Sequence, residues 1–403
     1  MTIGRIVLKS LRQHALSTWV TAFSIALAGG LLMSVWVVKQ QSQATFTGVN
    51  AGFDAVLGAR GSKLQLVLNA IFHLEASPGN LAWSDFLDIQ KNPNVDLAVP
   101  LAVGDNYRGY RLVGTTLDLF NKAQYTRGKK FELQPGGAWF DETRREAVVG
   151  DFVAHKMKLK VGDTFHPFHG LIFDEKNQHS ETYVVVGVLK PSNTPADRVI
   201  WIPLAGIQHM SGHDPKAATD VSAVLVRLKA GSAIAGFQMD MMYNKQGNRL
   251  TFAWPIGTVM AELFDKIGWF DKVLTLISYL VALVAAGSIL ASIYNSMNER
   301  RRELAILRAL GARRTTVFSA IIMESAAIAA LGMLVAFIIY AVLMTVVAGI
   351  IRAQTGVVLE PFAFNPVMLW APAGFILLGA FVGIVPALKA YRTDVAENLT
   401  PHS

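Results

Sequence analysis

The 403-residue chain contains no cysteine, and charged residues make up only 16% of it. The absence of cysteine excludes a disulfide framework, a thiolate zinc site, a cysteine nucleophile and a cysteine-ligated iron–sulfur cluster. Soluble domains carry roughly 25% charged residues. The low charge, together with 52% apolar residues, therefore excludes a disordered chain and argues against a single soluble globule.

Catalytic and nucleotide-binding motifs are also missing. The sequence has no G-x-x-x-x-G-K-[ST] phosphate loop, no G-x-S-x-G nucleophile elbow and no H-E-x-x-H zinc motif. Its carboxylates are scattered without a convincing catalytic pair. We therefore expect that this chain is not itself an enzyme.

Four long segments with little or no charge account for the apolar composition. A membrane-spanning helix needs about 20 mostly apolar residues, and each segment is longer, at 13–38, 273–298, 315–351 and 361–388. The third has 37 residues and one charge, Glu324; as a helix it would be roughly 55 Å long, against a hydrocarbon core of roughly 30 Å. We expect four spans, the third tilted or projecting from the membrane. The first is too long for a signal-peptide core and is interpreted as a retained anchor.

Lys and Arg near the ends of the spans predict the orientation. Eleven of them flank one side of the membrane, whereas the loop 352–360 on the other side has only Arg352. Both termini and the loop 299–314 are therefore predicted to be cytoplasmic, with residues 39–272 outside. That outer segment carries 25 basic and 23 acidic residues. The net charge of +8 is thus mostly a consequence of topology and does not predict nucleic-acid binding.

The outer segment is predicted to fold as a mixed α/β domain. Short apolar runs bounded by Gly, Pro, Asn or Asp indicate strands, at 95–103, 107–114, 147–150, 183–189, 199–202 and 221–228. Helical patterns lie at 64–72 and 83–90. The predicted fold class is an integral membrane α-helical protein with four transmembrane helices and a large extracytoplasmic α/β (α+β) domain inserted between helices 1 and 2.

The cytoplasmic loop between the second and third spans is the most informative segment. Residues 299–310 contain no helix breaker, and Gly311 is suited to end a helix. On a helical wheel, Arg301 and Arg308 share one face. The broad apolar face consists of Leu304, Ile306, Leu307 and Leu310. This pattern fits a helix lying on anionic headgroups as well as a helix that fills a groove on a soluble partner.

Residues 299–312 (ERRRELAILRALGA) resemble the signature loop of the FtsX/MacB/LolC-like permeases of ABC transporters. Other stretches are similar to this family's terminal motifs and to its MacB-type periplasmic core, at 6–12, 385–392, 146–150, 160–165, 184–189 and 197–204. The order of one span, a large outer domain and three spans is the family's own. The chain departs from the macrolide exporter in having no fused nucleotide-binding domain, and residues 58–81 match no family pattern.

The resemblance divides the chain into three regions. Residues 1–38 hold a cytoplasmic amphipathic helix and the first span, residues 39–272 the MacB-like α/β domain, and residues 273–403 an FtsX-like domain with spans 2–4, the coupling helix and a cytoplasmic C-terminal tail. It implies a multi-pass protein of the bacterial inner (cytoplasmic) membrane, with a periplasmic outer domain.

The resemblance also implies that the segment at about 299–312 is a coupling helix that docks into an ABC ATPase. The implied docking residues are Glu299, Arg301, Arg302, Glu303, Leu304, Ile306, Leu307, Arg308, Leu310 and Gly311. Two copies of a separate ATPase subunit would hold ATP and Mg²⁺, so this chain carries no cofactor, and a second permease copy would complete a homo- or heterodimer. ATP-driven closure would be transmitted to the outer domain for export or extraction of an envelope lipid, a lipoprotein or a hydrophobic compound.

Other interpretations remain open. One alternative is a transmembrane regulator that switches a periplasmic or lipoprotein partner without moving substrate. Another is an ABC permease that handles a metal or haem. A receptor without an ATPase partner is a further class. The substrate is not readable from the sequence.

Single positions in the spans are candidates for specific roles. Glu324 is an intramembrane acid, which marks either a structural ion pair or protonated acid, or a direct part in coupling. Small residues allow close helix contact in membranes and are candidates for a dimer interface: Gly287, Ser288, Ser325 and Gly332.

Seven of the nine histidines fall in the outer domain. His166 and His169 are three apart, and His209 and His213 are four apart, a spacing that on a helix can present two imidazoles to one metal ion. Pro167 and Gly212 nevertheless indicate loops. We expect solvated loop histidines and no bound metal, with His166, His169, His209 and His213 as ligands under the alternative.

Overall fold

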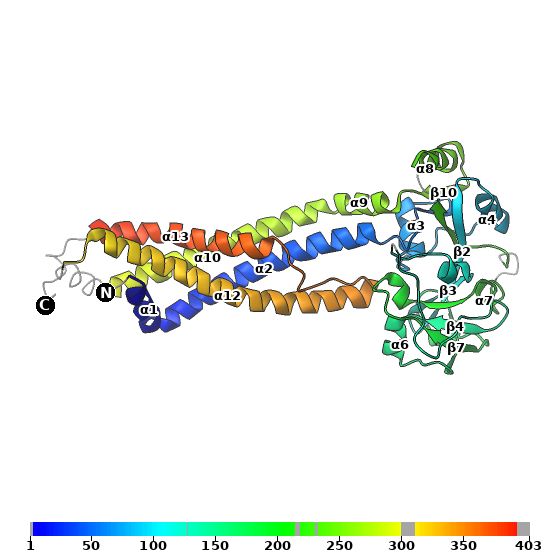
Figure 1. Cartoon of the computed structure of the whole chain (residues 1–403), viewed down its shortest axis with the longest axis horizontal. Coiled ribbons are helices and arrows are strands. Elements are labelled where there is room, and N and C mark those ends of the chain that lie inside the picture. The colour runs from blue at the N-terminus through cyan, green and yellow to red at the C-terminus, as the bar shows by residue number, and fades with distance from the viewer. Residues whose placement is uncertain (1–2, 127, 214–217, 230–232, 300–310, 393–403) are drawn as a thin grey trace. The chain divides into compact units, whose positions relative to one another are not determined.

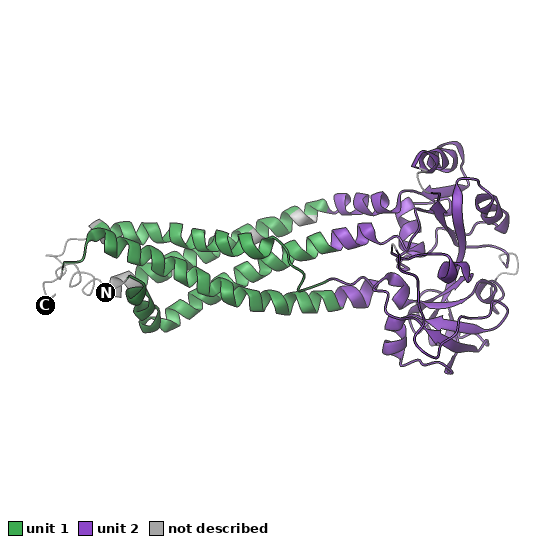
Figure 2. Cartoon of the chain, viewed as in Figure 1, with its two compact units in different colours: residues 1–41, 268–349, 360–403 green, residues 42–267, 350–359 purple. Residues whose placement is uncertain are grey.

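The computed structural model describes residues 3–126, 128–213, 218–229, 233–299 and 311–392 (Figure 1). The chain forms two compact units, coloured separately in Figure 2. The helical unit comprises 1–41, 268–349 and 360–403, and the α/β unit comprises 42–267 and 350–359.

Among the described residues, one short helix and four long ones build the helical unit. The short helix α1 covers Ile3–Gln13, and the long helices are α2 (Ala15–Gly48), α10 (Gly268–Glu299), α12 (Arg314–Thr355) and α13 (Val367–Arg392), of which α2 and α12 extend past the bounds of the unit. All four long helices are long and apolar enough to cross a membrane. The four predicted spans are therefore confirmed. The third is a single unbroken helix of 42 residues.

Small residues let α2 and α12 approach closely. A Cβ atom added at Gly332 would lie 2.7 Å from Cβ of Ile25 and 2.8 Å from the carbonyl oxygen of Ala22. One added at Gly29 would lie 2.5 Å from Sδ of Met333. Because lipid tails are as apolar as the side chains, association in the membrane depends on such close packing.

The contact between α12 and α13 has the same character. Ser325 is fully buried, and its Oγ lies 2.4 Å from where a Cβ atom at Gly383 would stand. At Gly379 an added Cβ atom would meet Cβ of Ala329 at 2.7 Å. Ser325 and Gly332 therefore pack inside the chain's own bundle.

The α/β unit is built on a ten-stranded mixed sheet. Its strands are β1 (Ala55–Ala59), β2 (Val95–Tyr107), β3 (Tyr110–Thr115), β4 (Glu146–Val149), β5 (Thr164–Phe165), β6 (Phe168–His169), β7 (Tyr183–Val188), β8 (Ile200–Pro203), β9 (Ala223–Leu228) and β10 (Leu250–Ala253). They lie in the order β10-β1-β9-β2-β3-β8-β4-β7-β5, and β6 pairs with β2. The pairs β3–β8 and β4–β7 are parallel, whereas the other pairs are antiparallel.

Short helices accompany the sheet. They are α3 (Lys63–Ala70), α4 (Trp83–Gln90), α5 (Asp118–Asn121), α6 (Asp151–Met157), α7 (Leu204–Gln208), α8 (Ala233–Asp240) and α9 (Ile256–Lys266), with the 3-10 turns η1 (Glu175–Asn177) and η2 (Pro195–Arg198) and the π-helical segment η4 (Met241–Gln246). The mixed α/β class is confirmed, and the six predicted strands and two predicted helices are present with ends that shift by a few residues. The sequence prediction missed β1 and β10, which pair with each other, and the two-residue strands β5 and β6.

Residues 58–81 form part of the domain's framework. The segment begins in β1, continues through α3 and ends at Leu81, which forms a bridge with Val221. Leu66 of α3 is fully buried and lies against Gly58, where an added Cβ atom would approach its Cδ1 to 2.3 Å. The absence of a family pattern here therefore does not mark a loose insertion.

Candidate functional site

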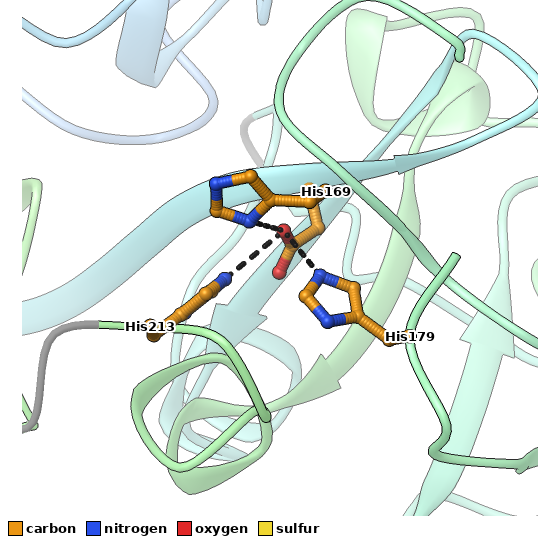
Figure 3. A group of neighbouring side chains, drawn as sticks. His169, His179 and His213 are labelled. Atoms are coloured by element: carbon orange, nitrogen blue, oxygen red, sulfur yellow. Dashed lines mark hydrogen bonds and ion pairs between the residues drawn. The ribbon is translucent and has the colours of Figure 1, made fainter. Parts of the chain in front are cut away.

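Four side chains converge on one point in the α/β unit: Asp105, His169, His179 and His213 (Figure 3). Oδ1 of Asp105 lies 3.4 Å from Nδ1 of His169 and 3.1 Å from Nε2 of both His179 and His213. One atom from each residue can be chosen so that all four lie within 4.8 Å of one another. We call this group the histidine cluster.

A bulge in β2 places Asp105. The pairing of β2 with β3 shifts register between Val103 and Asn106, and a bulge of this kind re-aims a side chain. Asp105 then stands directly opposite His169 in the short antiparallel pairing with β6. Asn106 holds the same loop, since its Nδ2 donates to the carbonyl oxygen of Gly170 at 2.8 Å.

Two further loops bring the other imidazoles. The backbone N–H of His179 donates to the carbonyl oxygen of Pro167 at 2.9 Å, which fixes the return of the chain toward β6. His213 follows α7 through Gly212, whose φ of +88° suits glycine. Glu181 anchors this second loop, because its carboxylate accepts from the N–H and the hydroxyl of Ser211, each at 2.9 Å.

The four side chains of the histidine cluster differ in how far they are exposed to solvent. The side chain of Asp105 is 0% exposed and that of His179 is 5% exposed, whereas His213 is 16% and His169 53% exposed. The hydrogen bond to Asp105 raises the pKa of His213. The second oxygen of Asp105, Oδ2, is buried and has no hydrogen-bond partner within the described part of the chain.

The exposed side of the cluster opens into a cavity of about 300 Å³. His169 and His213 line it from the cluster, and its other walls include Asn80, Gly104 and Ser222. The cluster is thus a buried carboxylate surrounded by three imidazoles, with a solvent-accessible route to the two outer rings.

The structure joins only part of the predicted histidine set. His169 and His213 meet, but Nδ1 of His166 contacts the carbonyl oxygen of Glu181 at 3.1 Å and His209 is exposed at the end of α7. These two rings are therefore not in the cluster: His166 contacts the backbone of Glu181, and His209 faces solvent.

Two members of the cluster were not predicted. Asp105 and His179 are 74 residues apart, and Asp105 and His213 are 108 apart. The available signal was the pair Asp105–Asn106, two polar residues that come directly after the apolar run 97–103 and Gly104.

Glu324 is buried in the helical unit, where it is 8% exposed. Its carboxylate accepts a hydrogen bond from Oγ of Ser10 in α1, a residue that is 1% exposed. Arg314, at the start of α12, lies over the ring of Tyr391, with 5.7 Å between Cζ and the ring centroid. A part for Glu324 in coupling remains a prediction.

Most of the predicted coupling helix lies outside the described residues. This applies to Arg301, Arg302, Glu303, Leu304, Ile306, Leu307, Arg308 and Leu310. Glu299 is the last residue of α10, and Gly311 has a φ of +98°, the left-handed conformation expected where a helix ends.

The four small residues proposed for a dimer interface differ in environment. Ser325 and Gly332 are occupied by contacts with α13 and α2 of the same chain, so we withdraw them from the proposed interface. Gly287 has no atom within 4 Å of its added Cβ position, and Ser288 donates to the carbonyl oxygen of Val284 at 3.0 Å.

Comparison with known families gives two matches that together cover most of the chain. The model of the MacB-like periplasmic core domain matches residues 18–241, and that of the FtsX-like permease C-terminal matches residues 275–395. The first match alone extends over more than half of the chain.

Curated relatives agree with these models at low identity. The chain is 20% identical to a macrolide export ATP-binding/permease protein MacB of Shewanella oneidensis, over 98% of this chain and 60% of that protein. It is 22% identical to the MacB of Brucella melitensis, over 96% of this chain and 58% of that protein. An uncharacterized ABC transporter permease of Methanocaldococcus jannaschii is 25% identical, over 65% of this chain and 64% of that protein. The chain thus spans about 60% of the length of these relatives.

Two solved structures are also similar. The extracellular domain of the noncanonic ABC-type transporter YknZ from Gram-positive bacteria is 18% identical, with a TM-score of 0.31 over 49% of this chain and 99% of that chain. The periplasmic region of MacB from Actinobacillus actinomycetemcomitans is 12% identical, with a TM-score of 0.35 over 54% of this chain and 94% of that chain.

Proposed function

Since the chain belongs to the family of FtsX-like permeases that carry a MacB-like periplasmic core domain, we propose that it is the transmembrane permease subunit of an ABC transporter. The observation that carries the proposal is the combination, in one chain, of four helices able to span a membrane and a large α/β unit. Its partner in this proposal is a cytoplasmic ABC ATPase in two copies, which would hold ATP and Mg²⁺.

The loop at 299–312 is the proposed docking element for that ATPase. It joins the end of α10 at Glu299 to the start of α12 at Arg314. A displacement of this loop acts directly on two spanning helices, and α12 continues unbroken for 42 residues. This arrangement supports transmission of ATP-driven movement along the helices toward the α/β domain.

The spans offer little for a polar conduit. Within the four predicted segments Glu324 is the one Asp, Glu, Lys or Arg residue, and the one histidine is His14 at the edge of the first segment. Glu324 is buried against Ser10. A hydrophilic pathway would need more lining groups than that. We therefore propose that the substrate is an envelope lipid, a lipoprotein or a hydrophobic compound handled on the periplasmic side of the bacterial inner membrane, with both termini cytoplasmic.

The proposal is tested at the loop. Leu307→Asp combined with Arg308→Glu alters the apolar and basic faces of the proposed docking helix. We expect the chain to insert normally but to lose most of its co-purifying ATPase and its coupled ATP turnover. Arg352→Glu is the matched control, because it reverses an arginine charge on the opposite side of the predicted membrane.

Unchanged ATP turnover and complex assembly in the loop variant would contradict the docking assignment. Mild-detergent purification of the full chain, with mass spectrometry of what accompanies it, also separates the alternatives. An ATPase together with a periplasmic protein whose activity changes with ATP would favour the regulator, whereas a chain that purifies alone would favour a receptor.

A further inference from the structure

We propose that Asp105, His169, His179 and His213 form a binding site for a divalent transition-metal ion, with Zn²⁺ as the ion that matches the donor set best. The site lies wholly within the α/β unit and uses three imidazole nitrogens and one carboxylate oxygen. It goes beyond the proposed permease function and does not depend on it.

The distances from the carboxylate oxygen to the three imidazole nitrogens match those between ligands of a tetrahedral Zn²⁺ ion. Zn²⁺ binds His nitrogen and carboxylate oxygen at about 2.0–2.1 Å, so two ligands of a tetrahedral ion lie about 3.3 Å apart. Oδ1 of Asp105 lies 3.4, 3.1 and 3.1 Å from the three imidazole nitrogens. Figure 3 shows the three rings directed at this one oxygen from different sides.

The hydrogen bonding of His213 is consistent with a metal ion in the cluster. Nδ1 of His213 lies 2.9 Å from the carbonyl oxygen of Ile207, so this nitrogen carries a proton. In a neutral ring, Nε2 then presents a lone pair to the carboxylate oxygen of Asp105, 3.1 Å away. Two acceptors face each other unless the ring is an imidazolium or a metal ion is bound. An N–H to carbonyl bond on the far nitrogen is also the usual way in which a protein orients a metal-binding histidine.

The carboxylate of Asp105 points to the same conclusion. It is fully buried, and a buried carboxylate is costly unless its charge is compensated. Its Oδ2 has no hydrogen-bond partner in the described residues. A divalent ion held by three neutral imidazoles compensates this charge and gives the unpartnered oxygen an electrostatic partner.

The donor set selects the class of metal. Imidazole suits Zn²⁺ and other later transition metals, whereas Mg²⁺ and Ca²⁺ prefer oxygen ligands. With no thiolate in the chain, the three histidines are the decisive donors. The ion can exchange with the surroundings, because His169 is 53% exposed and the cluster opens into the cavity of about 300 Å³.

The full-length chain, purified in detergent and stripped with a chelator, is titrated with Zn²⁺ by calorimetry, and bound zinc is counted by mass spectrometry after dialysis. We expect one tight Zn²⁺ per chain, unaffected by a large excess of Mg²⁺. Loss of a ligand in His213→Ala or His169→Ala is expected to weaken binding by about 100-fold or more, since loss of an outer hydrogen-bond partner of a ligand already costs 10–100-fold. Co²⁺ in place of Zn²⁺ should show the visible absorption of tetrahedral coordination.

His155→Ala and His209→Ala are the matched controls, because both rings are exposed and outside the cluster. They should retain the wild-type affinity. His169→Ala is expected to fold normally, because this ring is more than half exposed. Loss of binding in this variant would therefore not be due to misfolding. Absence of tight binding in the wild type, or equal loss in the cluster and control variants, would overturn the proposal and leave the cluster as an imidazolium–carboxylate group.

Discussion

Ser10 donates a hydrogen bond to the carboxylate of Glu324 across 314 residues of sequence. The bond ties the short amphipathic helix α1 to the third spanning helix, α12. Both side chains are buried, at 1% and 8% exposure. The one acid in the predicted spans is thus held by the segment that precedes the first span.

From this contact we predict that substitutions at Glu324 lower the unfolding temperature only when they remove the hydrogen bond to Ser10. Glu324→Gln keeps an acceptor for Ser10 and should unfold close to the wild-type temperature. Ser10→Ala and Glu324→Leu remove the bond, and polar contacts between membrane helices are worth about 0.6 kcal/mol on average and up to about 1.7 kcal/mol. Thermal unfolding of the detergent-solubilised chain measures the difference. Equal losses for the Gln and Leu variants would show that the hydrogen bond is not what stabilises α1.

Close packing of α2 and α12 predicts that Gly332→Ala is destabilising. The new methyl group would stand 2.7 Å from Cβ of Ile25, and forcing extra volume into a packed site costs about 1–3 kcal/mol. Gly349→Ala is the matched control in the same helix, because its added Cβ atom meets nothing within 4 Å. Thermal unfolding should separate the two variants, and a neutral Gly332→Ala would contradict the close approach.

In the α/β unit, Asp85 is predicted to be important for the stability of α4. Its carboxylate accepts from the backbone N–H of Ala82 at 3.2 Å and from Nη1 and Nη2 of Arg249. Loss of a helix-start hydrogen bond and of a charge-assisted pair should cost about 1–3 kcal/mol in Asp85→Ala. Asp88→Ala, an exposed position on the same helix, should change stability little. Denaturant unfolding checks both, and similar losses at the two positions would contradict the assigned contacts.

The lowered pKa of His73 leads us to predict that acid destabilises the α/β unit. Burial, aided by the charge of Arg111, lowers the pKa of His73 to about 3, whereas the unfolded chain binds this proton near pH 6.5. The unfolded state therefore gains a proton first as pH falls, so stability present above pH 6.5 declines between about pH 6.5 and 3. One proton is worth about 1.4 kcal/mol per pH unit, or about 2 kcal/mol between pH 7 and 5.

The test of this pH dependence compares slopes of stability against pH. His73 has a φ of +54°, and asparagine tolerates that conformation better than most residues, so His73→Asn is the informative variant. Its unfolding free energy should fall less between pH 7 and 5 than that of the wild type. His155→Asn, at an exposed ring, should keep the wild-type slope. An unchanged slope in His73→Asn would assign the acid sensitivity to other groups.

The sequence alone determined the class of this protein. Four apolar segments of 26 residues or more have few alternatives to spanning helices, and the structure has four helices that meet the same criterion. Most strands were also predictable, because period-two patterns and turn residues are local signals. The strands β1, β5, β6 and β10 were missed, and β5 and β6 have only two residues each, too few to show a period-two pattern.

Only the tertiary structure decided which polar groups meet. His166 has the same residue type as His169 and lies three positions away, yet only His169 faces Asp105, because β6 pairs with β2 at that register. A one-residue change of register would direct the side chain to the other face of the sheet. Whether a segment can be buried in the membrane or in a protein core depends on its own apolar residues, so local composition predicts it. Asp105, His179 and His213 meet because of a bulge in β2, a backbone hydrogen bond from His179 to Pro167 and the loop after α7. These features are far apart in sequence, so no local sequence pattern predicts the contact.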